Sequence, residues 1–163
     1  MNVTITNGTK ADRIICVRAD GTQAETTFPK KGPFPHDAVH FAVEKHLGLD
    51  NGFWGMVAAG RHPEELGELA KAAGHASASR AAVPDRSIIE LLQAERIVEC
   101  FEADMWSTAA PNDLLRETAR IACESSFVAA PDLTDDRITG IRAELALLSA
   151  QWAGGEIAFG WPG

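Results

Sequence analysis

The chain has 163 residues, a formal net charge of −8 and a hydrophobic content of 45%. This length and apolar content suit one domain with a real core, so residues 1–163 are predicted to form a single domain. An acidic surface repels phosphate backbones and anionic lipids, which argues against nucleic acid and membrane surfaces as partners. No stretch approaches the roughly 20 apolar residues that cross a bilayer.

The cysteines and the first residues bear on the compartment. Cys16, Cys100 and Cys123 are odd in number and widely spaced. They fit reduced, buried thiols better than a disulfide framework. The first residues lack the basic-then-apolar order of a secretory signal. These features predict a cytoplasmic protein.

Residues 1–29 are predicted to form an antiparallel β-meander. Polar and apolar residues alternate over 3–6, and residues 13–18 are rich in β-branched side chains. Asp20-Gly21 predicts a type I′ hairpin turn, because both central positions of that turn need positive φ. Three prolines and a glycine within 29–35 end the sheet, since proline cannot donate to a strand ladder.

Residues 35–154 are predicted to be helical, with breaks. We expect helices over 35–47, 53–60, 63–73 and 85–105, one that opens at 111 or 112 and ends before 131, and one from 134 or 135 to 154. The helix near 112 is expected to turn inward Leu114, Leu115, Ile121, Ala122 and Val128. The last helix has the clearest 3-4-3-4 apolar spacing, in Ile138, Ile141, Leu145, Leu148 and Trp152. Residues 74–82 are small and polar, which favours a loop or a frayed helix end.

Residues 156–161 alternate again and predict a final strand that can join the N-terminal meander. The predicted fold class is therefore α+β, a small antiparallel sheet from both chain ends packed against a layer of four to six helices. Such a sheet is too small to stand alone and needs helices against its apolar face.

One helix carries residues that can do chemistry. Because i and i+4 differ by about 40° on a helix, His36, His40 and Glu44 lie along one stripe at the edge of the apolar face. Two histidines at this spacing can bind one divalent metal ion, with the carboxylate as third ligand or base. Asp37 lies about 100° away and suits the helix dipole of the first turn instead.

The pattern is incomplete, so metal binding, direct acid/base work and a structural interpretation all stay open. It is not H-E-x-x-H, and a full metal site needs one more ligand, for which only His62 and His75 can be named. In the structural interpretation, His36 packs at the helix start and His40 bonds a neighbouring carbonyl or carboxylate.

Two further segments have a structural and a functional interpretation. The glycines of residues 51–60 match no phosphate-binding motif, so the segment is first a buried helix. In the functional alternative, Phe53, Trp54 and Met56 wall a small-molecule pocket beside the histidines. The acidic stripe Glu95, Glu99 and Glu102 is interpreted as a solvated face, although paired carboxylates can also bind metal or act as acid and base.

The segments PHDAVHFAVEKHLGL (35–49) and NGFWGMVAAG (51–60) together resemble a group of small bacterial proteins. In that group a Pro-His-Asp-x-x-His helix precedes a Gly-Phe-Trp-Gly segment, with a β-hairpin before them and helices after. The resemblance implies a bacterial origin and the α+β layout. It implies no activity, because none is assigned to that group.

Three classes of function follow from these patterns. The first is a non-catalytic small-molecule-binding or regulatory domain with a pocket near His36, His40 and Trp54. The second is a metal-dependent hydrolase that uses His36, His40 and Glu44. The third is a structural or oligomerisation module, a homo-oligomer in which the histidines only pack. The first is favoured narrowly, because the residues needed for catalysis are incomplete.

Overall fold

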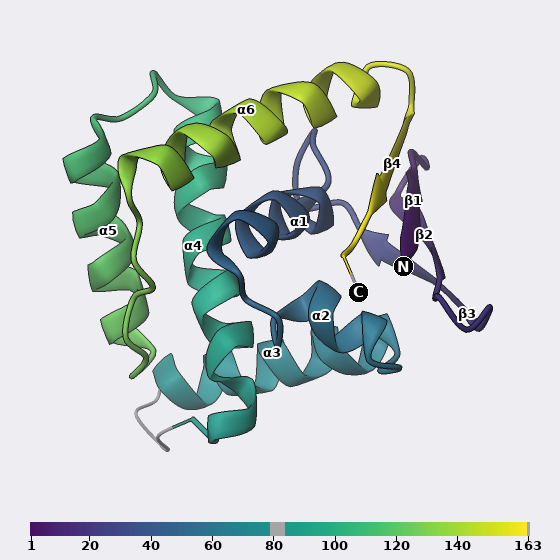
Figure 1. Cartoon of the computed structure of the whole chain (residues 1–163), viewed down its shortest axis with the longest axis horizontal. Helices are drawn as coiled ribbons and strands as arrows, with labels where there is room; N and C mark the ends of the chain where they lie inside the picture. The colour runs from purple at the N-terminus through teal and green to yellow at the C-terminus, as the bar shows by residue number, and fades with distance from the viewer. Residues whose placement is uncertain (79–83, 163) are drawn as a thin grey trace.

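The computed structural model describes residues 1–78 and 84–162 (Figure 1). It confirms an α+β fold with a small antiparallel sheet packed on helices. The elements, in chain order, are β1 (Asn2–Thr6), β2 (Ala11–Val17), β3 (Gln23–Pro29), α1 (His36–Leu47), α2 (Phe53–Ala58), α3 (Pro63–Ala78), the 3₁₀ turn η1 (Arg86–Ile88), α4 (Ile89–Trp106), α5 (Asn112–Ser125), α6 (Asp135–Trp152) and β4 (Glu156–Gly160).

The sheet joins both ends of the chain. Its strand order is β3-β2-β1-β4, and all neighbours are antiparallel. The predicted final strand is confirmed, since β4 pairs with β1 and sets Phe159 opposite Val3. Alternate residues of each strand are buried against the helices, while the other face is open, as expected for an antiparallel sheet covered on one side.

The turn between β2 and β3 differs from the predicted type I′ geometry. Gly21 has φ of 83°, and its N–H donates to the carbonyl of Arg18. Asp20 does not have the positive φ that type I′ demands; its carboxylate instead accepts a hydrogen bond from the Thr22 N–H at 2.9 Å. The loop is therefore the longer hairpin connection, in which one glycine in the left-handed region follows a type I turn.

Helix α1 is the centre of the molecule. In Figure 1 it lies between α6 and α2, with α4 crossing beside it and the sheet closing one end. Phe41 of α1 stacks on Phe159 of β4 at 4.0 Å between ring centroids, and Trp54 of α2 meets the same ring at 5.2 Å. Because α1 is covered on several sides, its polar residues must find partners inside the fold.

Two predicted helices differ in detail. Helix α3 continues to Ala78, five residues past the predicted end, and residues 79–82 of the expected loop lie outside the described residues. In α5 the predicted inward face is wrong for Leu114 and Ile121, which are 57% and 54% exposed. The buried residues are Leu115, Ala119 and Cys123. Helix α5 lies at the edge of the molecule and packs mainly against α4 (Figure 1), so only a narrow i, i+4 stripe of the helix is buried.

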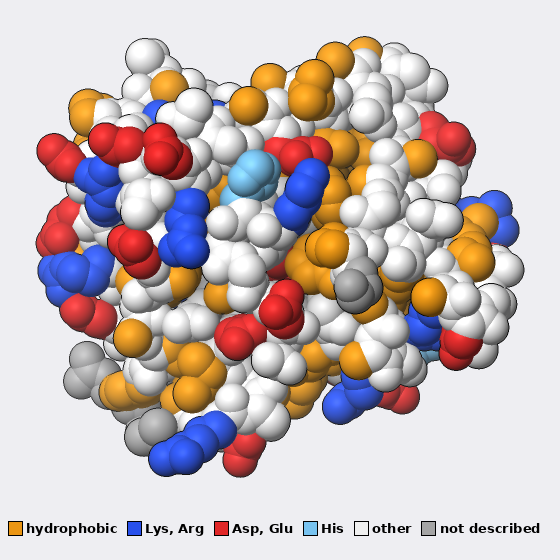
Figure 2. All heavy atoms as spheres, in the orientation of Figure 1, with side chains coloured by type: hydrophobic (Ala, Val, Ile, Leu, Met, Phe, Trp, Pro, Cys, Tyr) orange, Lys and Arg blue, Asp and Glu red, His pale blue; other side chains and the backbone are white. Residues whose placement is uncertain are grey.

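The predicted pattern of the last helix is confirmed. Ile138, Ile141, Leu145 and Leu148 of α6 are buried, and the Thr134 hydroxyl caps the helix by accepting from the Arg137 N–H. Charged side chains of both signs mix over the α5 side of the surface (Figure 2), where Arg120 pairs with two glutamates. No helix within the described residues is long and apolar enough to span a membrane.

Gly55 allows the chain to fold back on itself, and its replacement tests this packing. A Cβ at Gly55 would lie 1.8 Å from the Asp50 carbonyl oxygen, a backbone atom that cannot turn away. We expect Gly55→Ala to lower the free energy of unfolding by at least about 2 kcal/mol in urea denaturation.

The matched control is Gly67→Ala, inside α3. There a Cβ would meet the Phe28 ring at an ordinary 3.6 Å. Because alanine is the better helix former, this change should be neutral or stabilise by up to about 1 kcal/mol. Equal losses for the two variants would contradict the close approach at Gly55.

Candidate metal centre

Helix α1 places three polar side chains in the interior, as the i, i+4 spacing predicted. Pro35 precedes the helix in an extended conformation, and His36 begins it. His40 is 1% exposed and Glu44 is fully buried. Buried groups of this kind cost free energy unless each polar atom is paired, so their partners show what the helix is built to hold.

The carboxylate of Glu44 hydrogen-bonds the beginning of helix α2. Its Oε1 accepts hydrogen bonds from the backbone N–H of Phe53 at 2.9 Å and from Nδ1 of His40 at 2.9 Å. Its Oε2 accepts from the N–H of Trp54 at 2.8 Å. The carboxylate therefore satisfies the first donors of α2, where a helix has no internal acceptors. Both of its oxygens face donors, which hold the carboxylate toward α2.

This arrangement explains the glycine at position 52. A Cβ there would come within 2.6 Å of the Glu44 Cδ, so only glycine lets the carboxylate reach the start of α2. Trp54 adds a second tie, because its indole Nε1–H donates to the carbonyl of Asp37 at 2.9 Å. The Gly-Phe-Trp-Gly segment thus clamps the beginning of α2 onto α1.

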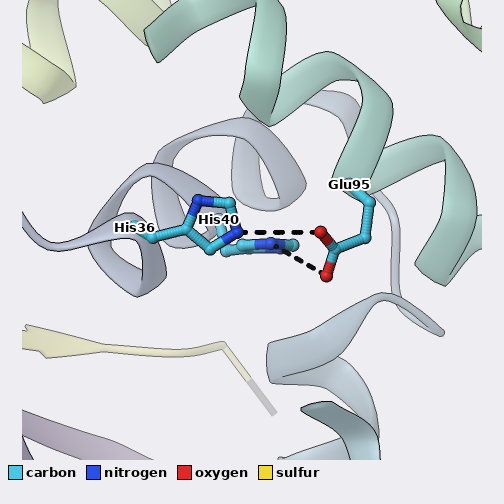
Figure 3. Close-up of side chains that lie close together, drawn as sticks. All are labelled: His36, His40 and Glu95. Atoms are coloured by element: carbon cyan, nitrogen blue, oxygen red, sulfur yellow. Dashed lines mark ion pairs between the residues drawn. The ribbon is translucent and has the colours of Figure 1, made fainter. Parts of the chain in front are cut away.

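His36 and His40 share one hydrogen-bonding pattern. Nδ1 of His36 is 2.8 Å from Oε1 of Glu102, as Nδ1 of His40 is 2.9 Å from Glu44. A carboxylate can only accept, so each Nδ1 carries the proton and donates. Each ring then presents Nε2 on its other side, and both Nε2 atoms point at the carboxylate of Glu95 on α4 (Figure 3).

The distances to Glu95 are too long for strong hydrogen bonds. Nε2 of His40 is 3.5 Å from Oε1, and Nε2 of His36 is 3.6 Å from Oε2. Charge-assisted N–H···O bonds are about 2.7–2.9 Å long. Two ligands about 2.1 Å from one tetrahedral ion lie about 3.4 Å apart. The ligand atoms of His36, His40 and Glu95 all fall within 4.8 Å of one another, so small side-chain movements suffice to close them on an ion.

The Nε2 atom of His36 is the clearest sign of an incomplete site. This atom is buried, in a side chain that is only 10% exposed, and it has no hydrogen-bond partner. Buried polar atoms are nearly always paired, and an exception needs an explanation. An ion between His36, His40 and Glu95 would supply the missing partner.

His36, His40 and Glu95 stabilise one another's charged forms. Burial lowers the pKa of His40, but the charge of Glu95 and the contacts with Glu44 and Glu95 outweigh it and raise the pKa to about 10. Burial also lowers the pKa of His36, and the carboxylates of Glu102 and Glu95 reverse this into a net rise. Burial raises the pKa of Glu95, yet both histidines hold it well below its usual range. A cation at this place, proton or metal, is therefore favoured.

A cavity of about 360 Å³ opens beside the histidines. Glu95 and Asp37 also line it, and Phe28 and Phe53 form an apolar part of its wall. Burial raises the pKa of the Asp37 carboxyl. This volume lies within the range of small-molecule pockets.

The structure brings some of the predicted site residues to the cavity and leaves others in the core. His36, His40 and Phe53 line the cavity. Trp54 is fully buried in the core, and Met56 packs half-buried against it; neither lines this cavity. Of the two further ligands named from the sequence, His62 does not join the cluster and hydrogen-bonds the Glu64 N–H instead. The side chain of His75 lies outside the described residues.

The two carboxylates of α4 are the residues that sequence reasoning misjudged. Glu95 and Glu102 were interpreted as part of a solvated face, but their side chains are only 20% and 27% exposed and both face α1. Glu99 is exposed as expected and pairs with Arg96. Glu95 and Glu102 reach the two histidines because α4 packs across α1. The way in which two helices pack cannot be predicted from the sequence of either helix alone.

Comparisons with protein-family models, with curated proteins and with solved structures found no match.

The clamp between α1 and α2 gives a stability prediction. In Glu44→Gln one oxygen must serve three donors, and the new NH₂ faces at least one of them. Leaving a buried donor unpaired costs about 2–4 kcal/mol, so we expect a loss of that size in urea denaturation.

Glu65→Gln is the control for this change. Its side chain is 62% exposed on α3, and its replacement should alter the free energy of unfolding by less than about 0.5 kcal/mol. A Glu44→Gln protein as stable as the control would show that the buried carboxylate is not needed.

Proposed function

We propose that this chain is a metal-dependent enzyme whose centre binds one divalent ion through His36, His40 and Glu95. The observation that carries the proposal is the shared orientation of the histidines. Each gives its Nδ1–H to a carboxylate and turns Nε2 to a third carboxylate common to both. Histidines that bind metals are usually held in this way, because the outer carboxylate fixes the ring and the tautomer.

The number of protein ligands supports catalysis rather than a structural role. Structural zinc sites are closed by four protein ligands, whereas catalytic sites have three and keep one position for water or substrate. Here the cluster has two imidazoles and one carboxylate, and it borders a cavity of about 360 Å³. Two histidines and a glutamate form one of the known ligand sets of hydrolytic zinc enzymes.

The proposed reaction is hydrolysis. A Zn²⁺ ion at this centre would lower the pKa of a bound water to about 7 and so would supply hydroxide near neutral pH. Water supplies both the hydroxyl and the proton that the two products take up, and no further reactant is needed. His36, His40 and Glu95 would hold the ion, while Glu102 and Glu44 would keep the rings in position.

A second candidate function is a non-catalytic pocket for a small molecule. The raised pKa of His40, to about 10, favours an imidazolium between Glu44 and Glu95 in the absence of metal. A charged, ordered floor beneath the walls of Phe28 and Phe53 would bind a polar ligand without any ion. The two candidates separate on whether metal binds.

Metal binding is the direct test. Tag-free protein at pH 8, where neutral imidazole is more accessible, is titrated with Zn²⁺, Mn²⁺ and Ni²⁺ by calorimetry. We expect one ion per chain for at least one of them. Glu95→Gln should weaken binding at least about 100-fold, because it removes a direct ligand. Excess metal should also raise the melting temperature, by linkage.

The matched control is Glu99→Gln on the same helix, one turn beyond Glu95. Glu99 pairs with Arg96 at the surface, so its loss should change the metal affinity less than about twofold. Absence of a bound ion for all three metals, or equal affinities for the two variants, would reject the metal centre and leave the non-catalytic pocket.

Glu102 provides a finer prediction. It does not face the proposed ion but orients His36 through its Nδ1. Such outer carboxylates typically contribute 10–100-fold to metal affinity. We therefore expect Glu102→Gln to weaken binding by about tenfold with the stoichiometry unchanged, measured in the same titration. A variant with wild-type affinity would show that His36 needs no such support.

A further inference from the structure

We infer that the cavity above the metal centre takes a small organic anion, whose acidic group lies between Lys31 and Lys71 and whose apolar body packs on Phe28 and Phe53. This inference rests on the proposed function, since the bound ion forms part of the same pocket. It names the class of substrate that the centre would act on.

Lysines are concentrated at this cavity in an otherwise acidic chain. The sequence has five, Lys10, Lys30, Lys31, Lys45 and Lys71. Three of them line this one cavity, whereas no described arginine does. The lining lysines come from two separate parts of the fold, the segment after β3 and helix α3. Lysine is a compact point charge on a flexible stem, which suits an anion that enters and leaves.

The three lysines are not equivalent. Lys30 is already engaged: its Nζ lies 2.9 Å from Asp12 and 5.5 Å from the centroid of the Trp152 ring. Lys31 and Lys71 have no carboxylate within 4.0 Å among the described residues, and both are exposed at the cavity. They are therefore the two charges that remain for a ligand.

A divalent ion would add to the attraction that the lysines exert. The cavity lining has three lysines and four carboxylates, Asp12, Asp37, Glu68 and Glu95. An ion held by His36, His40 and Glu95 would place a further positive charge in the lining of the same cavity. Anion binding should therefore be tighter in the metal-loaded protein, because opposite charges attract strongly in a partly enclosed site.

The rest of the wall favours an apolar body on the anion. The rings of Phe28 and Phe53 meet edge to face, with centroids 6.3 Å apart, and Phe53 also lies 5.6 Å from the His40 ring. A carboxylate or phosphate carried on one ring or a short chain fits a volume of about 360 Å³. Larger polymers do not.

The test compares probes of one shape and different charge. Benzoate, phenyl phosphate and the neutral benzamide are titrated by calorimetry into the full chain, with and without the metal that binds it. We expect both anions to bind the metal-loaded protein at least about tenfold more tightly than benzamide, and more tightly than they bind metal-free protein. The ratio of benzoate to phenyl phosphate affinity distinguishes a carboxylate from a phosphate substrate.

Three variants locate the anion. Lys31→Met and Lys71→Met should each weaken benzoate or phenyl phosphate binding about five- to tenfold. Neither variant should weaken metal binding, because removal of a nearby positive charge does not disfavour a cation. Lys45→Met changes the net charge equally but pairs with Glu144 away from the cavity, and it should leave anion binding unchanged.

The outcomes separate this inference from the proposed function. Failure of metal to bind rejects the proposed function and, with it, this inference. Normal metal binding with equal affinity for benzoate and benzamide overturns the inference alone. Metal-dependent anion binding that Lys31→Met and Lys71→Met leave intact also overturns it, because the anion would then be held by the ion without the lysines.

Discussion

The carboxylate of Glu44 is the interaction on which the rest of the structure depends. It lies in the interior, where it accepts hydrogen bonds from two backbone N–H groups of α2 and from the imidazole N–H of His40. Its burial is favourable only because every contact is a donor. One residue thereby fixes the angle between α1 and α2, the tautomer of His40 and the close approach that requires glycine at 52. The direction in which His40 points is a consequence of how α2 begins.

Much of the fold was predictable because local patterns are sufficient for it. Alternation over the strands and the 3-4-3-4 spacing of α6 depend only on which face is buried, and both are confirmed. The inward face of α5 was not predictable in the same way. Leu114 and Ile121 are as apolar as Leu115, but α5 packs mainly against α4 and buries one narrow stripe. Composition alone overestimates the buried face of a peripheral helix.

Only the part of the candidate site that lies on one helix was predictable from the sequence. His36, His40 and Glu44 share a stripe by helix geometry, so the sequence brings them together without a fold. Which carboxylate faces both Nε2 atoms depends on the crossing of α1 and α4, which joins residues 55 positions apart in the case of His40 and Glu95. Glu44 was a natural first choice as a ligand. In the structure both of its oxygens accept hydrogen bonds from α2, a contact that no local pattern reveals.

A purely structural interpretation accounts for one histidine better than for the other. His40 has a short bond to Glu44, and a protonated ring between two carboxylates needs nothing more. His36 is different, because its Nε2 is buried without a hydrogen bond and Glu95 stops 3.6 Å away. If packing alone had placed Glu95, a rotation of its side chain could give one histidine a short bond at the expense of the other. Instead the carboxylate stands at nearly equal distance from both, with one oxygen toward each ring. The proposed ion, shared by the three groups, would account for that symmetry, because it would attract all three ligands to one point.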